Sequence, residues 1–254
     1  MTNEKYNPIP KRRFRFPGES LSLKISEIID ETQEWVVLLA LVWLVAVTEF
    51  LRAYTPSRPH PWFWITAALG TTLWCAVKIY QTRQQVRRFR LGMTGERYVG
   101  RLLEDQLIPH GYHVFHDVQG RIGNIDHLVI GPSGVFTIET KTRSKRQSDQ
   151  KVSYDGTKVL VDGFEPDRDP ISQALMQKQW VGEQMNPVLG KLIPIQPVVV
   201  YPEWFVSPGP SGAKVWVLNE KWVASSVRKH AITLSPDEIS ALVAFMKSRT
   251  LPVD

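Results

Sequence analysis

The stretch GNIDHLVIGPSGVFTIETK, residues 123–141, reads as two strands joined by a Gly-Pro-Ser-Gly turn. Alternating apolar residues on both sides of the turn indicate a hairpin with a buried face. The turn places Asp126 opposite Glu139 on one face of the hairpin, with Cβ atoms about 5 Å apart. Because side chains alternate along a strand, Lys141 lies on the same face as Glu139. The hairpin therefore predicts two carboxylates and an ammonium group clustered at its open end.

The facing carboxylates need a neutralising partner. They repel each other across the pair of strands, and the repulsion grows as the site becomes buried. A shared proton, the neighbouring Lys141 ammonium or a bound metal ion can offset this cost. Mg²⁺, or Mn²⁺ in its place, is the expected cofactor, because a hard divalent ion takes carboxylate oxygens and keeps several waters. The structural alternative is a surface salt-bridge cluster on a solvated strand end, with Lys141 neutralising one acid.

The chain from residue 92 onward has a mixed pattern of helices and strands. An Asp-Pro pair at 169–170 predicts the start of one helix, and a capping box at Ser235 predicts another. The order of the elements predicts an α/β fold, with a sheet of mixed direction and helices on its faces. Strands are expected at 112–116, 125–130, 135–140, 158–161, 197–201 and 214–218, and helices at 94–108, at 170–185 and after Ser235.

Two polar residues on these helices are candidates for the same site. Glu96 shares a helical face with Val99 and Leu103, so it is expected to point inward. Stabilisation of the helix dipole in the first turn is its alternative role. Gln173 lies four residues after the expected cap Asp169, and its alternative role is that of a surface amide.

Three stretches of the sequence together resemble the NERD (nuclease-related) domain. They are GMTGE at 92–96, the hairpin at 123–141 and DPISQ at 169–173. The two glycines of GMTGE are expected to allow a tight turn into the first helix. That domain is similar to the PD-(D/E)XK nuclease superfamily, which is named for an Asp followed by Glu-x-Lys. The resemblance covers roughly residues 90–200 and implies a restriction-endonuclease-like mixed sheet flanked by helices.

The resemblance also implies roles for the candidate residues. Asp126 and Glu139 would be metal ligands, and Glu96 would complete or steady the metal site from the first helix. Lys141 would orient or deprotonate the attacking water, and Gln173 would assist from the later helix. The implied reaction is hydrolysis of a phosphodiester bond in DNA rather than in RNA.

Basic residues that follow the hairpin are candidates for contact with nucleic acid. Arg143, Lys145 and Arg146 follow Glu-x-Lys closely and can track a phosphate backbone, or they can form a solvated loop. Residues 91–254 carry 18 Lys and Arg against 18 Asp and Glu, so this part of the chain has no net charge. Because proteins that grip long DNA without sequence preference usually have a basic surface, binding would rest on a local patch, a metal or a partner. Trp180 is expected in the core or at an interface rather than as a base-stacking platform.

The N-terminal third contains two long apolar stretches, at 35–54 and 62–81, with Trp or Tyr near their ends. Twenty residues at about 1.5 Å each reach about 30 Å, the thickness of a bilayer's hydrocarbon core. Aromatic residues at both ends suit the headgroup region. The two stretches therefore predict a transmembrane helical hairpin over 35–81. A buried helical hairpin in a soluble protein is the alternative.

Cations on both sides of the hairpin predict its orientation. Residues 1–90 carry 13 Lys and Arg against 7 Asp and Glu. Most lie in a basic N-terminal segment, 1–34, and in a juxtamembrane linker, 82–91, where they can also be read as nucleic-acid patches. The positive-inside rule puts both termini and the soluble domain in the cytoplasm, at the inner (cytoplasmic) membrane. The remaining chain divides into a NERD-like domain, 92–200, and a C-terminal extension, 201–254.

The sequence thus predicts a membrane-anchored, metal-dependent nuclease that acts on DNA at the cytoplasmic face. One alternative is a catalytically inactive nuclease-fold module that tethers nucleic acid or a protein partner to the membrane. Another is a component of a membrane assembly or signalling system. The facing carboxylates favour the enzyme, because a binding module has little reason to keep them. The single cysteine, Cys75, excludes an intramolecular disulfide framework and a multi-cysteine metal site.

Overall fold

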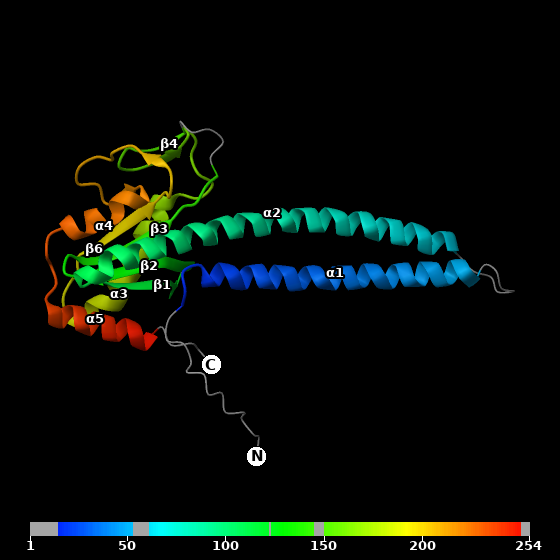
Figure 1. Ribbon diagram of the computed structural model, residues 1–254, viewed down its shortest axis with the longest axis horizontal. Coiled ribbons are helices and arrows are strands. Elements are labelled where there is room, and N and C mark those ends of the chain that lie inside the picture. The colour runs from blue at the N-terminus through cyan, green and yellow to red at the C-terminus, as the bar shows by residue number, and fades with distance from the viewer. Residues whose placement is uncertain (1–14, 53–60, 122, 145–149, 250–254) are drawn as a thin grey trace, which may run out of the picture. The chain divides into compact units, whose positions relative to one another are not determined.

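The computed structural model describes residues 15–52, 61–121, 123–144 and 150–249 (Figure 1). The described part falls into two compact units. Ser20–Leu91 form one unit, and the described residues up to Glu19 together with those from Gly92 onward form the other.

Helix α1, Glu19–Arg52, and the part of helix α2, Pro61–Leu107, that precedes Gly92 supply the first unit. Both are long and apolar enough to cross a membrane. Only 6% and 11% of their most apolar windows are buried, which is unlike the core helix of a soluble protein. Within this unit Trp43 Nε1 donates a hydrogen bond to Thr72 Oγ1 at 3.0 Å.

Helix α2 is longer than the sequence suggested. It runs without a break through residues 82–91, which were expected to form a linker, and it includes the helix expected at 94–108. The physical reason is the absence of any proline between Trp62 and Leu107. The expected tight turn at GMTGE is therefore wrong, since both glycines lie inside the helix.

The second unit is built on a sheet of mixed direction, as predicted, and this sheet has five strands. The pairs β1–β2 and β2–β3 are antiparallel, and the pairs β3–β6 and β6–β8 are parallel. In sheet order they are β1 (His113–Gly120), β2 (Gly123–Gly131), β3 (Gly134–Thr140), β6 (Ile195–Val200) and β8 (Trp216–Leu218).

The second unit also contains a smaller, three-stranded sheet. Its centre is β4 (Lys151–Tyr154), which is antiparallel to β5 (Val159–Val161) and parallel to β7 (Phe205–Val206). The strand expected at 158–161 therefore pairs here and not in the main sheet. Strands β4 and β7 had no counterpart in the sequence prediction.

Helices cover both faces of the main sheet (Figure 1). Helices α3, Pro170–Leu189, and α5, Pro236–Arg249, pack on one face. The last turns of α2 and helix α4, Glu220–Lys229, pack on the other, and a short 3-10 helix, Ile108–His110, follows α2. The predicted caps are confirmed: Asp169 Oδ1 accepts from Ile171 N at 2.9 Å, and Ser235 N donates to Glu238 Oε2 at 2.9 Å. Helix α4 was not expected.

The hairpin β2–β3 has the register that its turn predicts. Ile130 faces Val135, and the ladder extends from Gly131–Gly134 to His127–Ile138. Leu128, Ile130 and Val135 belong to the core beneath α3 and α5, whereas Val129, Phe136 and Ile138 belong to the core beneath α2 and α4. Glu139 lies on the α3 face, where Gln177 Nε2 donates to it, and Asp126 is close enough to Glu139 for the charge of Glu139 to affect its pKa.

Candidate functional site

The two strands of the hairpin part where the carboxylates begin. The β2–β3 ladder ends at His127–Ile138, and Asp126 and Glu139 come directly after it. There the Asp126 side chain takes over the role of a ladder carbonyl, because its Oδ2 accepts a hydrogen bond from Thr140 N at 2.6 Å. The sequence predicted the register but not this separation.

Strand β3 stays in the sheet after β2 has left it. Its pairing with β6 continues through Thr140, which faces Val200, and Lys141 N then donates to Val200 O at 2.8 Å. Glu139 and Lys141 therefore stand on a backbone that is fixed on the β6 side and open on the β2 side.

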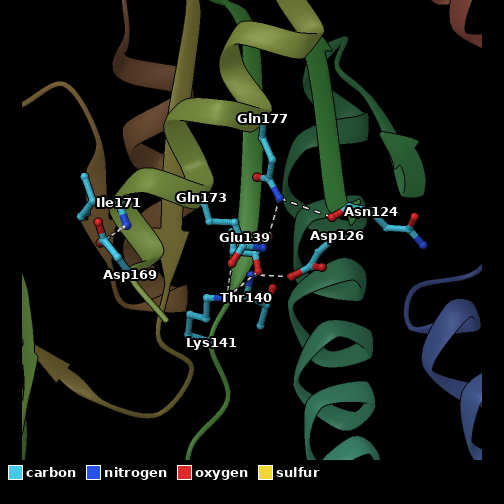
Figure 2. Close-up of polar contacts among 9 residues, drawn as sticks. All are labelled: Asn124, Asp126, Glu139, Thr140, Lys141, Asp169, Ile171, Gln173 and Gln177. Carbon is cyan, nitrogen blue, oxygen red and sulfur yellow. Dashed lines mark hydrogen bonds and ion pairs between the residues drawn. The ribbon is translucent and has the colours of Figure 1, made fainter. Parts of the chain in front are cut away.

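Both carboxylate oxygens of the buried Glu139 side chain accept hydrogen bonds from neighbouring side chains (Figure 2). Lys141 Nζ donates to Oε1 at 2.7 Å, and Gln177 Nε2 donates to Oε2 at 2.6 Å. Lys141 Nζ also donates to Gln173 Oε1 at 2.8 Å, so the helix α3 fixes the position of the ammonium. The predicted association of Gln173 with the hairpin is thus present as a direct contact with Lys141.

Burial and neighbouring negative charges raise the pKa of Asp126 well above its ordinary value. The largest cause is burial, followed by repulsion from Glu139 and Glu96. The hydrogen bond from Thr140 and the charge of Lys141 act in the opposite direction but do not balance these effects. A bound proton or an added cation therefore relieves the repulsion, which is the electrostatic condition expected of the paired carboxylates.

Glu96 reaches the site from α2, the helix on the opposite face of the sheet. It is partly buried, and its charge contributes to the raised pKa of Asp126. The neighbouring Gly95 explains how the helix comes so close: a Cβ atom at this position would lie 1.7 Å from Thr142 Oγ1 and 2.8 Å from Thr142 Cβ. Gly95 thus serves packing against the segment after Lys141 rather than the turn that the sequence suggested.

Gly95→Ala is expected to lower the free energy of unfolding by about 1–3 kcal/mol, because the added methyl group overlaps Thr142. Thermal unfolding of the full chain in detergent measures this change. Gly70→Ala in the same helix is the matched control, since no atom lies within 4 Å of its Cβ position. Equal melting of Gly95→Ala and wild type would show that Thr142 moves aside without cost. Thr142→Gly in the Gly95→Ala background should restore stability.

Gln177 was not predicted as a site residue. It is buried, and besides Glu139 its Nε2 contacts Asn124 O at 3.4 Å. The signal was available in the sequence, because Gln177 follows Gln173 by four residues and so shares its helical face. What the sequence could not show is that α3 crosses the sheet at the height of Glu139.

Of the three cations proposed to contact nucleic acid, the structure describes Arg143. Arg143 is exposed two residues beyond Lys141, and its carbonyl accepts a hydrogen bond from Trp204 Nε1 at 3.1 Å. Lys145 and Arg146 lie outside the described residues.

The donor set suits a hard divalent ion with ligands from outside the protein. Among the residues that the structure describes, no group of three or more His, Cys, Asp or Glu side chains is arranged to hold a metal ion. Asp126 and Glu139 still offer a carboxylate pair, and Mg²⁺ is commonly bound through one or two carboxylates, waters and substrate phosphates. The pair therefore fits such an ion, with Glu96 as a nearby third charge.

Comparison with known proteins gives short matches. The small ribosomal subunit protein uS4 of Crocosphaera subtropica is 31% identical over 104 residues, which are 40% of this chain and 48% of that protein. Its counterpart in Picosynechococcus is 26% identical over 127 residues, 49% of this chain and 58% of that protein. An uncharacterized protein of Bacillus anthracis is 44% identical over 55 residues, 20% of this chain and 26% of that protein.

The chain thus spans about half the length of the first two relatives and less of the third. No solved structure matches. The family model of the nuclease-related domain (NERD) matches residues 91–202. This segment contains the β2–β3 hairpin and the first half of α3, which together carry the carboxylates, the lysine and both glutamines. Residues 91–202 are therefore similar to the nuclease-related domain.

Proposed function

We propose that the protein is a membrane-anchored, metal-dependent nuclease of the PD-(D/E)XK type, with a restriction-endonuclease-like fold, that hydrolyses phosphodiester bonds of DNA. The observation that carries the proposal is the buried Glu139, held by Lys141 and Gln177 beside Asp126 where β2 and β3 part. The match of residues 91–202 to the nuclease-related domain supports the same class of reaction.

Each side chain has a defined part in this proposal. Asp126 and Glu139 would hold Mg²⁺ or Mn²⁺, and Glu96 would steady the site from α2. The ion, when bound, lowers the pKa of a coordinated water and neutralises charge on the phosphate. Lys141 uses two of its three N–H donors for Glu139 and Gln173, and the third can donate to the attacking water or to a phosphate oxygen.

The reaction forms a bond between the oxygen of water and phosphorus and breaks the bond from phosphorus to a sugar oxygen. One proton leaves the water, and the departing sugar oxygen takes up a proton. Lys141 would take part in these transfers, and Gln173 keeps its ammonium beside the carboxylates. Arg143, and with it Lys145 and Arg146, would contact the phosphate backbone next to the site.

The membrane part of the proposal rests on α1 and α2. Their length and hydropathy suit two spans, and their low burial leaves apolar surface for lipid. The cations that flank the apolar stretches support an orientation with both termini and the nuclease-related domain in the cytoplasm, at the inner membrane.

Cleavage of DNA by the full chain, purified in detergent, tests the function. Wild type is expected to cut with Mg²⁺ or Mn²⁺ and not with EDTA, and Glu139→Gln is expected to be at least about a thousandfold slower. Glu165→Gln is the matched control, because Glu165 forms an exposed ion pair with Lys158 at the same 2.7 Å as the pair Glu139–Lys141. RNA of the same sequence serves as the second substrate.

A binding module without catalysis is the second candidate. The observation that favours it is the even balance of 18 cationic and 18 anionic residues in 91–254, which is unusual for an enzyme that grips DNA. DNA binding by wild type without cleavage under all metal conditions would select this candidate over the enzyme.

A further inference from the structure

A pocket lies directly beside the carboxylate site, between the end of the β1–β2 hairpin and helix α3. Gln177 belongs to both places: it lines the pocket, and its Nε2 holds Glu139 Oε2 at 2.6 Å. Gly123 and Ile125, close to Asp126 on β2, form part of the opposite wall. The pocket therefore lies next to the Glu139 carboxylate, with the Gln177 side chain between them.

The pocket offers an apolar surface with an aromatic ring. Trp180 is partly buried against the core beneath α3 and α5, and Met176, one turn earlier, is 45% exposed. The end of the hairpin approaches the ring at Gly120, whose Cβ position lies 3.8 Å from Trp180 Cε3. A side chain at position 120 would overlap Gly123 O, which lies 2.7 Å from the same position, and would therefore disturb the hairpin end that forms one wall of the pocket.

Polar groups surround this apolar surface. Arg121 lies exposed at the end of the hairpin and lines the pocket. On the α3 side Gln179 Nε2 donates to Glu183 Oε1 at 2.9 Å, and both side chains line the pocket. The arrangement combines a flat ring, a cation for phosphate, and amide and carboxylate groups that can bind the edge of a base.

We propose that an unpaired nucleotide next to the scissile phosphodiester lies across the open side of this shallow pocket, whose volume of about 40 Å³ is too small to enclose a base. The base packs on Trp180 and Met176, and Arg121 contacts the phosphate beyond it. Only a base outside a duplex stack can place its face on a protein ring, so the substrate class is DNA with a single-stranded segment, such as a frayed end, a gap or a flap. This inference rests on the proposed nuclease function, because it takes the carboxylates as the position of the scissile phosphate.

The inference also accounts for the absence of net charge in the soluble part. Stacking of a base on an aromatic side chain gives affinity that does not depend on a broad basic surface. A protein that holds one unpaired nucleotide by stacking and a few phosphates by Arg121 and Arg143 can bind its substrate with balanced charge elsewhere.

Fluorescence anisotropy of the full chain in detergent tests the pocket without requiring cleavage. The probes are a labelled single-stranded DNA oligonucleotide and the blunt duplex of the same sequence, in EDTA. We expect tighter binding of the single strand, and about tenfold weaker single-strand binding for Trp180→Ala. Arg121→Ala should weaken binding severalfold. Trp222→Ala on α4 and Lys178→Ala on the exposed side of α3 are matched controls and should bind like wild type.

Two results would overturn the pocket assignment: equal affinity of wild type for single strand and duplex, or unchanged single-strand affinity in Arg121→Ala and in a folded Trp180 variant. Trp180→Phe, which keeps a ring, replaces Trp180→Ala if thermal unfolding shows loss of the fold, and it should bind between the two. If wild type cuts both DNA forms equally and the pocket variants change nothing, the pocket fails and the nuclease stands. If no cleavage occurs, the nuclease fails and the anisotropy still decides the pocket.

Discussion

Asp126→Asn is expected to abolish DNA cleavage while raising the melting temperature measured without divalent ions. Burial and repulsion from Glu139 and Glu96 make the Asp126 carboxylate costly, as its raised pKa indicates. Asn has nearly the same shape, carries no charge and can still accept the hydrogen bond from Thr140 N. The substitution therefore removes a repulsion that the folded protein otherwise carries, together with an oxygen ligand that hydrolysis needs.

The pH dependence of the same variant has a defined sign. Unfolded Asp126 titrates near 3.8, and the folded group titrates well above that value. Between the two pKa values the folded protein holds a proton that the unfolded chain has released, so the stabilisation is complete below the lower pKa and is lost as pH rises through the folded one. Wild type should lose stability relative to Asp126→Asn across this window. Mg²⁺ should raise the melting temperature of wild type and leave that of Asp126→Asn unchanged.

Asp155→Asn provides the control for this prediction. It is the same chemical change at an exposed carboxylate, whose pKa is lowered to about 2, chiefly by the backbone N–H groups of Lys158 and Thr157. Its substitution should not raise the melting temperature, and cleavage should be retained. A variant Asp126→Asn that cuts DNA like wild type, or that melts below wild type in EDTA, would contradict the role given to this carboxylate.

The core of the site could be predicted because it depends on local rules. A short turn between two alternating strands leaves one register, and that register brings Asp126 and Glu139 to the same end of the hairpin. Lys141 follows from the period of two along the strand. The cap at Asp169 fixes where α3 begins, whereas a role for Gln173 was implied by the resemblance of DPISQ, residues 169–173, to the nuclease-related domain.

The parts that could not be predicted depend on contacts between distant segments. The strands part at Asp126 while β3 remains paired with β6, about sixty residues later in the chain. Gln177 acquires its role only when α3 packs across the hairpin at Glu139. Gly95 looked like a turn residue, since nothing near it in the sequence reveals the closeness of Thr142.

Strands β4 and β7 and helix α4 were not predicted, and the reason is different. Strand β7 has two residues and β4 has four, so neither is long enough to display a period. Helix α4 has ten residues, and its cap was visible in Asn219, whose side chain accepts a hydrogen bond from Lys221 N at 3.0 Å. The prolines and glycines of residues 202–213, which precede this helix, indicate an irregular loop.

Lys141→Met is expected to lose cleavage by at least about a thousandfold and, unlike Asp126→Asn, to lower the stability of the fold. Without the ammonium, the buried Glu139 carboxylate keeps the hydrogen bond from Gln177 but loses the one from Lys141. Gln173 Oε1 also loses the hydrogen bond that Lys141 donates. Breaking a buried ion pair from one side costs several kcal/mol, and the partial exposure of Lys141 reduces this to about 1–3 kcal/mol. Cleavage rates and thermal unfolding of the full chain measure the two effects.

The double variant Glu139→Gln/Lys141→Met separates stability from chemistry. A neutral Gln at position 139 needs no ammonium and can exchange hydrogen bonds with Gln173 and Gln177, so the double variant should melt close to wild type. It should remain inactive, because both the metal ligand and the lysine are absent. Lys158→Met, which breaks the exposed pair with Glu165, should change neither property measurably. Recovery of cleavage in the double variant would refute a direct role of this pair in the reaction, since only its charge balance would then matter.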